Sequence, residues 1–494
     1  MSQRDDERLL AHVRPDAWKN PDPLPSYDFV VIGGGTAGLV CAAGAAALGA
    51  RVALVERTRL GGECLNTGCV PSKALLRSAR VVAEARAGAA VGVNANATID
   101  FDAVMSRLPA RQAALAPNDS ASRLASRGVH VFFGAAHFEG PREVRVGDAL
   151  LRFRKAVLAT GSRPAQPAIE GLSDIPYLTN ETVFSLTLQP RALAVLGGGA
   201  VGCELAQAFA LFGTNVTLIE RAPDILPSED HEAARIVRAS MANDGVRVLT
   251  GEAVSSMRRY GDGVQIAHAS GPTVVDAVLI ATGRAPLADG LDLERAGIRH
   301  DAEGITVNDF LQTSNPRVYA AGDVCSRVRF THAADAMARI VVQNALFFGR
   351  RRVSALTIPS CIFTRPEVAH IGVTSSDAAA WGARALTVSL DQVDRAVVDD
   401  ETDGFVRIYH RGGRIVGATI VSPHAGDVIA AVAVAMRAGA TLSDMAAIPF
   451  PYPTLGLAFK RAGDLYRSEA LTPGIARVLR WYFGVKLLPW SHSR

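Results

Sequence analysis

The sequence FVVIGGGTAG (29–38) is a short apolar run followed by a G-x-G-x-x-G turn, and an Ala-rich stretch continues after it. The apolar run predicts a buried strand, and the Ala-rich stretch predicts a helix. Gly33 makes the tight turn, Gly35 lets the backbone approach a pyrophosphate, and Gly38 allows close helix–strand packing. The next apolar run ends at Glu56, whose carboxylate can accept the hydroxyls of an adenosine ribose. This stretch therefore predicts a Rossmann-like unit that binds a dinucleotide.

The same unit recurs later in the chain, with its glycines and its acid at one constant offset. The second copy has Gly197, Gly199, Gly202 and Glu220. Two further apolar runs end alike in Ala-Thr-Gly, at Gly161 and Gly283, and can bring a strand end beside a bound nucleotide. A single glycine turn is weak support, because such turns also occur where nothing binds. Two copies with their acids in register predict two Rossmann-like domains and two dinucleotides.

The second copy also indicates which nicotinamide is used. Glu220 would hydrogen-bond the ribose of NADH and repel the 2′-phosphate of NADPH. Arg221 follows directly and could partly reverse that preference. We expect NADH, with NADPH possible.

Composition excludes several classes of protein. The 494 residues are enough for several domains, and 49% apolar with 20% charged residues is typical of globular chains. A net charge of +4, with both signs interspersed, gives no basic patch for nucleic acid. Residues 29–50 carry no charge and are long enough for a membrane span, but their glycines are placed as in a strand-turn-helix. Six cysteines and a charged N-terminus indicate a cytoplasmic protein without a signal peptide.

Two cysteines stand close together in GGECLNTGCVPSK (61–73). Cys64 and Cys69, with Gly68 before a predicted helix start, can close a short disulfide at a helix N-terminus, where a thiolate is stabilised. That arrangement suits reversible redox chemistry. Half of a metal site and two unrelated core cysteines are the alternatives. No metal site is expected, because the other cysteines are scattered singly and are interpreted as core residues: Cys41, Cys203, Cys325 and Cys361.

These motifs, with Glu204 in the second unit and Ala-Gly-Asp323 further on, resemble the class I flavin disulfide reductases. That family includes glutathione reductase, dihydrolipoamide dehydrogenase and mercuric reductase. The resemblance covers roughly residues 27–465. It implies an α/β fold with two Rossmann-like dinucleotide-binding domains and a C-terminal α+β dimerisation domain, in a homodimer. It also implies FAD at the first unit and NAD(P)H at the second.

The resemblance divides the chain into six parts. They are an N-terminal extension (1–26), the first part of the FAD-binding domain (27–165), the NAD(P)-binding domain (166–285), the second part of the FAD-binding domain (286–352), the dimerisation domain (353–466) and a C-terminal tail (467–494).

The resemblance also implies roles for single residues. Asp323 would bind the flavin ribitol, and Thr331-His332-Ala would line the isoalloxazine. Cys69 would be the charge-transfer thiol against the flavin, and Cys64 the interchange thiol that meets the substrate.

Lys73 would sit near flavin N5, paired with Glu204, because a fixed cation stabilises the negative charge of a reduced flavin. A solvated surface lysine is the alternative, although the chain has only five lysines. Lys155, by contrast, is expected to precede a strand and to lie at the surface.

The acceptor depends on one departure from the family pattern. Disulfide-reducing members carry a His that protonates the leaving thiolate, and a Glu follows it five residues later. This chain has Tyr452 and Leu457 there, and a phenol with a pKa of about 10 cannot cycle in the same way. The segment 450–454 resembles the mercuric reductase version, and soft Hg(II) suits thiolates. Mercuric reductases, however, also have a C-terminal cysteine pair, whereas the last cysteine here is Cys361.

The sequence therefore predicts an FAD-dependent NAD(P)H oxidoreductase that passes electrons through Cys64 and Cys69 to a small-molecule or metal-ion acceptor, as mercuric reductase does. A dihydrolipoamide dehydrogenase-like or other small-disulfide reductase is one alternative, and a flavin redox partner or sensor for another protein is the other. Tyr452 is either catalytic or an aromatic residue that packs at the dimer interface.

The tail has one apolar helical face, formed by Ile475, Val478, Leu479 and Tyr482, with further aromatic residues nearby that include Trp490. Docking on the protein's own surface and weak contact with a membrane are both open for this segment.

Overall fold

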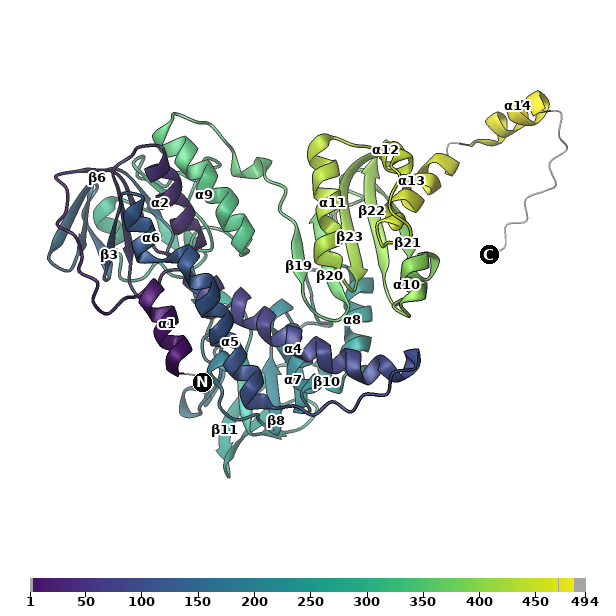
Figure 1. The fold of residues 1–494 in the computed structure, drawn as a ribbon, viewed down its shortest axis with the longest axis horizontal. Coiled ribbons are helices and arrows are strands. Elements are labelled where there is room, and N and C mark those ends of the chain that lie inside the picture. Colours follow the sequence, from purple (N-terminus) through teal and green to yellow (C-terminus); the bar gives the residue numbers. More distant parts are fainter. Residues whose placement is uncertain (1–2, 470, 484–494) are drawn as a thin grey trace. The chain divides into compact units, whose positions relative to one another are not determined.

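The computed structural model describes residues 3–469 and 471–483, and the chain divides into two compact units. The first holds residues up to 227 together with 238–358, and the second holds 228–237 together with the chain from 359 onward. Figure 1 traces the elements of each unit along the sequence. Trp490 lies outside the described residues.

The first unit contains a sheet centred on the strand that precedes the first glycine turn. Its parallel strands are β3 (Val129–Phe133), β2 (Val52–Glu56), β1 (Tyr27–Ile32), β6 (Ala149–Leu158) and β18 (Val318–Ala320). The antiparallel strands β5 (Glu143–Val146) and β4 (Ala136–Gly140) extend from β6. Side chains of β1 alternate between two cores: Phe29 and Val31 pack with helices, whereas Val30 and Ile32 pack with β4 and β5. A strand buried on both faces explains the uninterrupted apolar run in the sequence.

The second glycine turn lies in a separate parallel sheet of the same unit. Its strands are β10 (Val246–Thr250), β9 (Asn215–Glu220), β8 (Ala192–Leu196) and β14 (Ala277–Ile280). An antiparallel layer packs on it, formed by β11 (Val254–Tyr260), β12 (Gly263–His268) and β13 (Thr273–Val275). The two Ala-Thr-Gly motifs meet, because the strands that follow them, β7 (Ser162–Pro164) and β15 (Arg284–Pro286), pair with each other.

Helices and a small strand pair complete this part of the molecule. The helices are α1 (Gln3–Val13), α2 (Thr36–Ala47), α3 (Gly62–Asn66), α4 (Cys69–Ala87), α5 (Phe101–Leu115), α6 (Ala121–Ser126), α7 (Ala200–Leu211) and α9 (Thr331–Leu346), while α8 (His231–Asn243) has residues in both units. The strand pair is β16 (His300–Asp301) with β17 (Gly304–Ile305).

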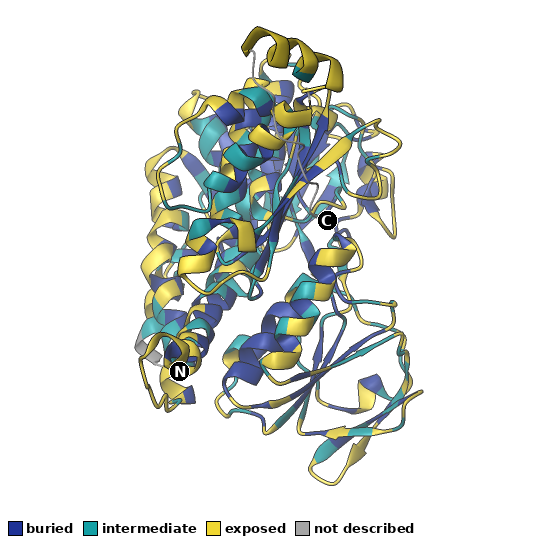
Figure 2. Ribbon diagram, turned by 90° about the vertical axis from the view of Figure 1, so that its right-hand side faces the viewer, coloured by how far each residue is buried: buried dark blue, intermediate teal, exposed yellow. Residues whose placement is uncertain are grey.

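The second unit is an antiparallel sheet covered by helices. The strand order is β19 (Ser360–Ile362), β20 (Glu367–Gly372), β23 (Arg414–Ser422), β22 (Phe405–Arg411) and β21 (Arg384–Ser389). The helices are α10 (Asp394–Val398), α11 (Ala425–Ala438), α12 (Leu442–Ala447), α13 (Leu457–Glu469) and α14 (Pro473–Phe483). Figure 2 shows that the sheet strands are mostly buried and the outer helix faces exposed.

The fold confirms the strand-turn-helix predicted for residues 29–50, which form β1 and α2. No helix within residues 3–469 and 471–483 is long and apolar enough to cross a membrane. One outcome differs from expectation. Lys155 lies inside β6 and donates to the carbonyl of Pro316 (2.9 Å), so the expectation that it precedes a strand is wrong. The N-terminal extension contains α1, whose Leu9 and Val13 are buried in the core beside Phe29.

The four cysteines outside the 61–73 motif, which are interpreted from the sequence as core residues, are buried to different degrees. Cys41 and Cys203 are buried, and Cys325 and Cys361 are half-buried. Burial raises the pKa of the Cys325 thiol to about 12, so it stays protonated at neutral pH.

Candidate active site

The two glycine turns share one hydrogen-bonding pattern. In the first copy Gly34 N–H donates to the Glu56 carboxylate at 2.7 Å, and in the second Gly198 N–H donates to Glu220 at 2.6 Å. The backbone N–H two residues after each acid donates to the other carboxylate oxygen, at 2.6 Å and 2.7 Å. Both carboxylates are buried at the ends of their strands. The duplication seen in the sequence therefore extends to the conformation of the acid.

The third glycine of each turn has the packing role predicted for it. A Cβ on Gly38 would lie 1.7 Å from the Gly33 carbonyl oxygen, and one on Gly202 would lie 1.9 Å from that of Gly197. Gly33 and Gly197 have φ values of +109° and +105°, a region that favours glycine.

The residues present fit a dinucleotide at each turn. Helices α2 and α7 have Gly35 and Gly199 at their N-caps, and no side chain of a described residue caps either helix. The first-turn N–H groups thus lack a side-chain acceptor and can bind a pyrophosphate. Gly62 approaches so closely that a Cβ on it would lie 2.6 Å from the Gly35 Cα.

The cysteine pair stands at the start of a long helix. Cys64 belongs to α3, and Cys69 is the first residue of α4, as predicted. Both are thiols in this structure, and Cys69 Sγ lies 3.3 Å from Oγ1 of Thr331, the first residue of α9. A hydrogen bond from Cys64 lowers the pKa of the Cys69 thiol, with help from Thr331 and the charge of Lys73, against the effect of burial. The same hydrogen bond, with burial, raises the pKa of Cys64.

One turn further along α4, Lys73 lies on the same helix face as Cys69. Its Nζ donates to Oε2 of Glu204 at 2.9 Å. Glu204 belongs to α7 and its side chain is only 6% exposed. The predicted pairing of these two residues is confirmed.

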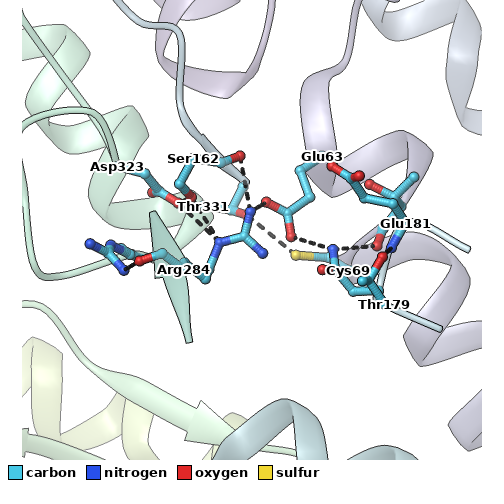
Figure 3. A network of polar contacts seen from close by, with 11 residues as sticks. Glu63, Cys69, Ser162, Thr179, Glu181, Arg284, Asp323 and Thr331 are labelled. Atoms are coloured by element: carbon cyan, nitrogen blue, oxygen red, sulfur yellow. Dashed lines mark hydrogen bonds and ion pairs between the residues drawn. The ribbon is translucent and has the colours of Figure 1, made fainter. Parts of the chain in front are cut away.

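A polar network beside the thiols was not foreseen (Figure 3). Arg284 Nε donates to Ser162 Oγ at 2.8 Å, and Ser162 donates to Asp323 at 2.6 Å. The same guanidinium binds the carboxylate of Glu63, whose other oxygen accepts from Asn180 at 2.9 Å. Burial raises the pKa of Glu63 to about 7 although Arg284 opposes it, and the nearby Asp323 and Cys69 raise it further.

Part of this network had a signal in the sequence. Ser162 and Arg284 each follow directly after an Ala-Thr-Gly motif, so the pairing of β7 with β15 brings them together. Glu63 lies inside the cysteine motif, next to Cys64. Its pairing with Arg284 joins segments far apart in the chain and had no sequence signal.

Two glycines and a histidine complete the set of predicted residues in this unit. Gly161 and Gly283 have φ values of +77° and +135°, where the backbone leaves the two strands. The His332 ring stacks on Phe330, with centroids 5.4 Å apart. No group of three or more His, Cys, Asp or Glu residues suited to a metal ion occurs in the described part of the chain.

Tyr452 belongs to the second unit and is 73% exposed. A hydrogen bond with Asp394 raises the pKa of its phenol. The phenol is therefore protonated at neutral pH, which agrees with the expectation that it does not cycle as an acid–base group.

Comparison with known proteins places this geometry in a family. The family described as pyridine nucleotide-disulphide oxidoreductase matches residues 27–338, and its dimerisation domain matches residues 358–462. A mercuric reductase of Streptomyces lividans is 36% identical over 90% of this chain and 97% of its own length. A dihydrolipoyl dehydrogenase of Thermus scotoductus is 33% identical over 91% of this chain and 99% of its own.

Among solved structures, the HOCl-induced flavoprotein disulfide reductase RclA of Escherichia coli, determined as a Cu(II) complex, is similar. It has a TM-score of 0.81 and 28% identity, with 90% of this chain and 100% of RclA covered. The dimerisation domain supports a homodimer. The chain therefore belongs to the class I pyridine nucleotide-disulphide oxidoreductases, enzymes with two Rossmann-like domains and a C-terminal dimerisation domain that depend on FAD and use NAD(P)H.

Proposed function

We propose that the protein transfers electrons from NADH, by way of FAD and the Cys64–Cys69 pair, to a soft metal ion held by these thiolates, with Hg(II) as the candidate. When bound, FAD accepts a hydride from the nicotinamide and passes two electrons onward. The overall reaction balances as NADH and Hg(II) giving NAD⁺, Hg(0) and one proton. The disulfide is reduced to two thiols before the metal binds. The two thiols then lose their protons and return to the disulfide as their two electrons reduce the bound Hg(II) to Hg(0).

The thiolate character of Cys69 carries this proposal. The sulfur lies at the N-terminus of a 19-residue helix and accepts hydrogen bonds that lower its pKa. A thiolate is a soft ligand, and a bound metal ion needs no acid to protonate a leaving thiolate. Tyr452, with its raised pKa, suits such a reaction better than disulfide reduction. The Cu(II) complex of RclA is a precedent for a transition-metal ion bound to a related protein.

The remaining residues support the electron path. Lys73, oriented by Glu204, is the cation that we assign to the reduced flavin, and Asp323 is the acceptor for the ribitol. Glu56 would hold the adenosine ribose of FAD, and Glu220 that of NADH.

A reductase of small disulfides is the second candidate, and Glu63 favours it. This carboxyl group, with a pKa of about 7, is half protonated near neutral pH beside the thiols. It could give its proton to a leaving thiolate, the task that Tyr452 cannot perform. Relatives named dihydrolipoyl dehydrogenase agree with this alternative.

Anaerobic NADH oxidation by the FAD-loaded enzyme separates the two candidates. We expect turnover with Hg(II) supplied in excess thiol, with kcat/KM at least about tenfold above that for lipoamide or glutathione disulfide. Cys64→Ser and Cys69→Ser should each abolish it, whereas the control Cys361→Ser, in the other unit, should not. Faster turnover with lipoamide or glutathione disulfide would overturn the metal assignment in favour of disulfide reduction.

We also propose a cytoplasmic location. None of the six cysteines forms a disulfide in the structure, and two of them are needed as thiols, a state that is best kept in a reducing compartment.

A further inference from the structure

Helix α14 stands apart from every hydrophobic core of its unit. None of its residues is buried, although it follows directly after α13, which packs Ala458, Phe459 and Ala462 into the core. In Figure 2 this last helix is exposed along its length. Of the two interpretations open for the tail, docking on the unit's own surface is therefore not observed for residues 473–483, the helical part of the tail that the structure describes.

The apolar face of α14 is exposed to an unusual degree. Ile475, Val478, Leu479, Tyr482 and Phe483 lie on one side of the helix and are 40% to 73% exposed. The neighbouring Trp481 is 84% exposed. Aromatic residues beside an aliphatic stripe are typical of helices that lie in the headgroup region of a bilayer.

The charge of the tail is one-sided. Glu469 is the last acidic residue of the chain, and the residues after it include Arg477, Arg480, Lys486 and Arg494. On α14 the two arginines lie opposite the apolar face, and neither forms an ion pair with any residue within 3–469 or 471–483. A basic polar face opposite an apolar face complements an anionic lipid surface, whereas another protein surface would need matching acidic groups.

We propose that α14 binds the surface of a membrane rich in anionic phospholipid, with its apolar face between the headgroups and its arginines toward the lipid phosphates. This goes beyond the electron transfer proposed above and is independent of which acceptor is used. Each basic residue near an anionic surface strengthens binding about fivefold. The helix has only three turns, so the contact is reversible and sensitive to salt.

Sedimentation with extruded vesicles tests the proposal on the FAD-loaded, full-length protein. We expect binding to vesicles of phosphatidylglycerol mixed with phosphatidylcholine, and little to phosphatidylcholine alone. Ending the chain after Leu471 should abolish binding while keeping the ion pair of Arg384 with Glu469 (2.6 Å) and therefore the end of α13.

Charge reversal on the helix gives the sharper comparison. Arg477→Glu with Arg480→Glu should weaken binding at least about 25-fold, from two lost contributions of about fivefold each. The same reversal at Arg411 and Arg414, two exposed residues of the β22–β23 hairpin, should leave it within twofold.

Three results would overturn the proposal: equal sedimentation of the full-length and shortened proteins, equal binding to neutral and anionic vesicles, or conversion of the dimer to a monomer on shortening. The last would assign α14 to the contact between subunits. NADH oxidation with the acceptor found in the turnover assay should be unchanged by shortening, which separates a failed membrane contact from a failed catalytic assignment.

Discussion

Replacing Cys64 by alanine should raise the pKa of the Cys69 thiol by about one to two pH units. The hydrogen bond from Cys64 is the largest influence that stabilises the thiolate in the structure. A hydrogen bond to a charged group contributes about 1.5–3 kcal/mol, and one pH unit corresponds to about 1.4 kcal/mol. Because the thiolate is the charged form, losing the donor makes it form only at higher pH.

The assay uses the absorption band that a thiolate gives beside oxidised flavin. In Cys64→Ala and Cys64→Ser no disulfide can form, so Cys69 is a free thiol without any reductant. The serine hydroxyl keeps a donor at this position, so Cys64→Ser is the matched control. Titration of the band should give a pKa for the alanine variant about one to two units above that of the serine variant. Two titration curves that coincide would refute the assigned hydrogen bond, and loss of the band in Cys64→Ser would refute the role given to Cys69.

Four further predictions concern other parts of the molecule. Lys73→Arg should slow flavin reduction by NADH in stopped-flow measurements about tenfold, because a planar guanidinium replaces a compact ammonium; an unchanged rate would return Lys73 to a structural role. Glu220→Gln should lower the ratio of kcat/KM for NADH to that for NADPH about tenfold, since a charge that repels the 2′-phosphate is lost; a constant ratio would contradict its ribose role. Arg407→Met should lower the free energy of unfolding by about 3–5 kcal/mol in urea denaturation, because it leaves Asp230, only 4% exposed and 2.7 Å from Arg407, without its ion pair. Glu63→Gln should remove a fall in disulfide-reductase activity as pH rises through about 7, the pKa at which the carboxyl loses its proton; the same pH profile in both proteins would exclude Glu63 as the acid.

Much of the fold could be predicted because its signals are local. A strand, a glycine turn and an acid follow one another within about 30 residues, and the repeat of that order reports two nucleotide-binding domains. The cysteine motif likewise places both thiols at a helix start. Helix α1 had no such signal, because its first residues are mostly charged and only Leu9 and Val13 enter the core. Lys155 was misplaced because β6 begins several residues before the apolar run from which this strand was predicted.

From the residues alone, the candidate site was predictable only where one element carries several of its groups; the pairing of Lys73 with Glu204 was implied by the family resemblance. Cys69 and Lys73 share a face of α4, so their spacing of four residues already indicates proximity. The network of Glu63 with Arg284 joins the cysteine motif to the strand that follows the second Ala-Thr-Gly motif. Such pairings depend on how sheets and helices pack, and a single sequence does not report them.

The charges around the thiols show why hydrogen bonds matter most for Cys69. Lys73 lowers its pKa, but Glu204 raises it, and these two residues are 2.9 Å apart. The other nearby cation, Arg284, is held by Glu63. Each cation is thus largely offset by its own carboxylate, so neither presents a free positive charge to the sulfur. The thiolate depends instead on neutral donors and on the N-terminus of α4, which is why removing the Cys64 proton donor should change its pKa more than exchanging Lys73 for another cation.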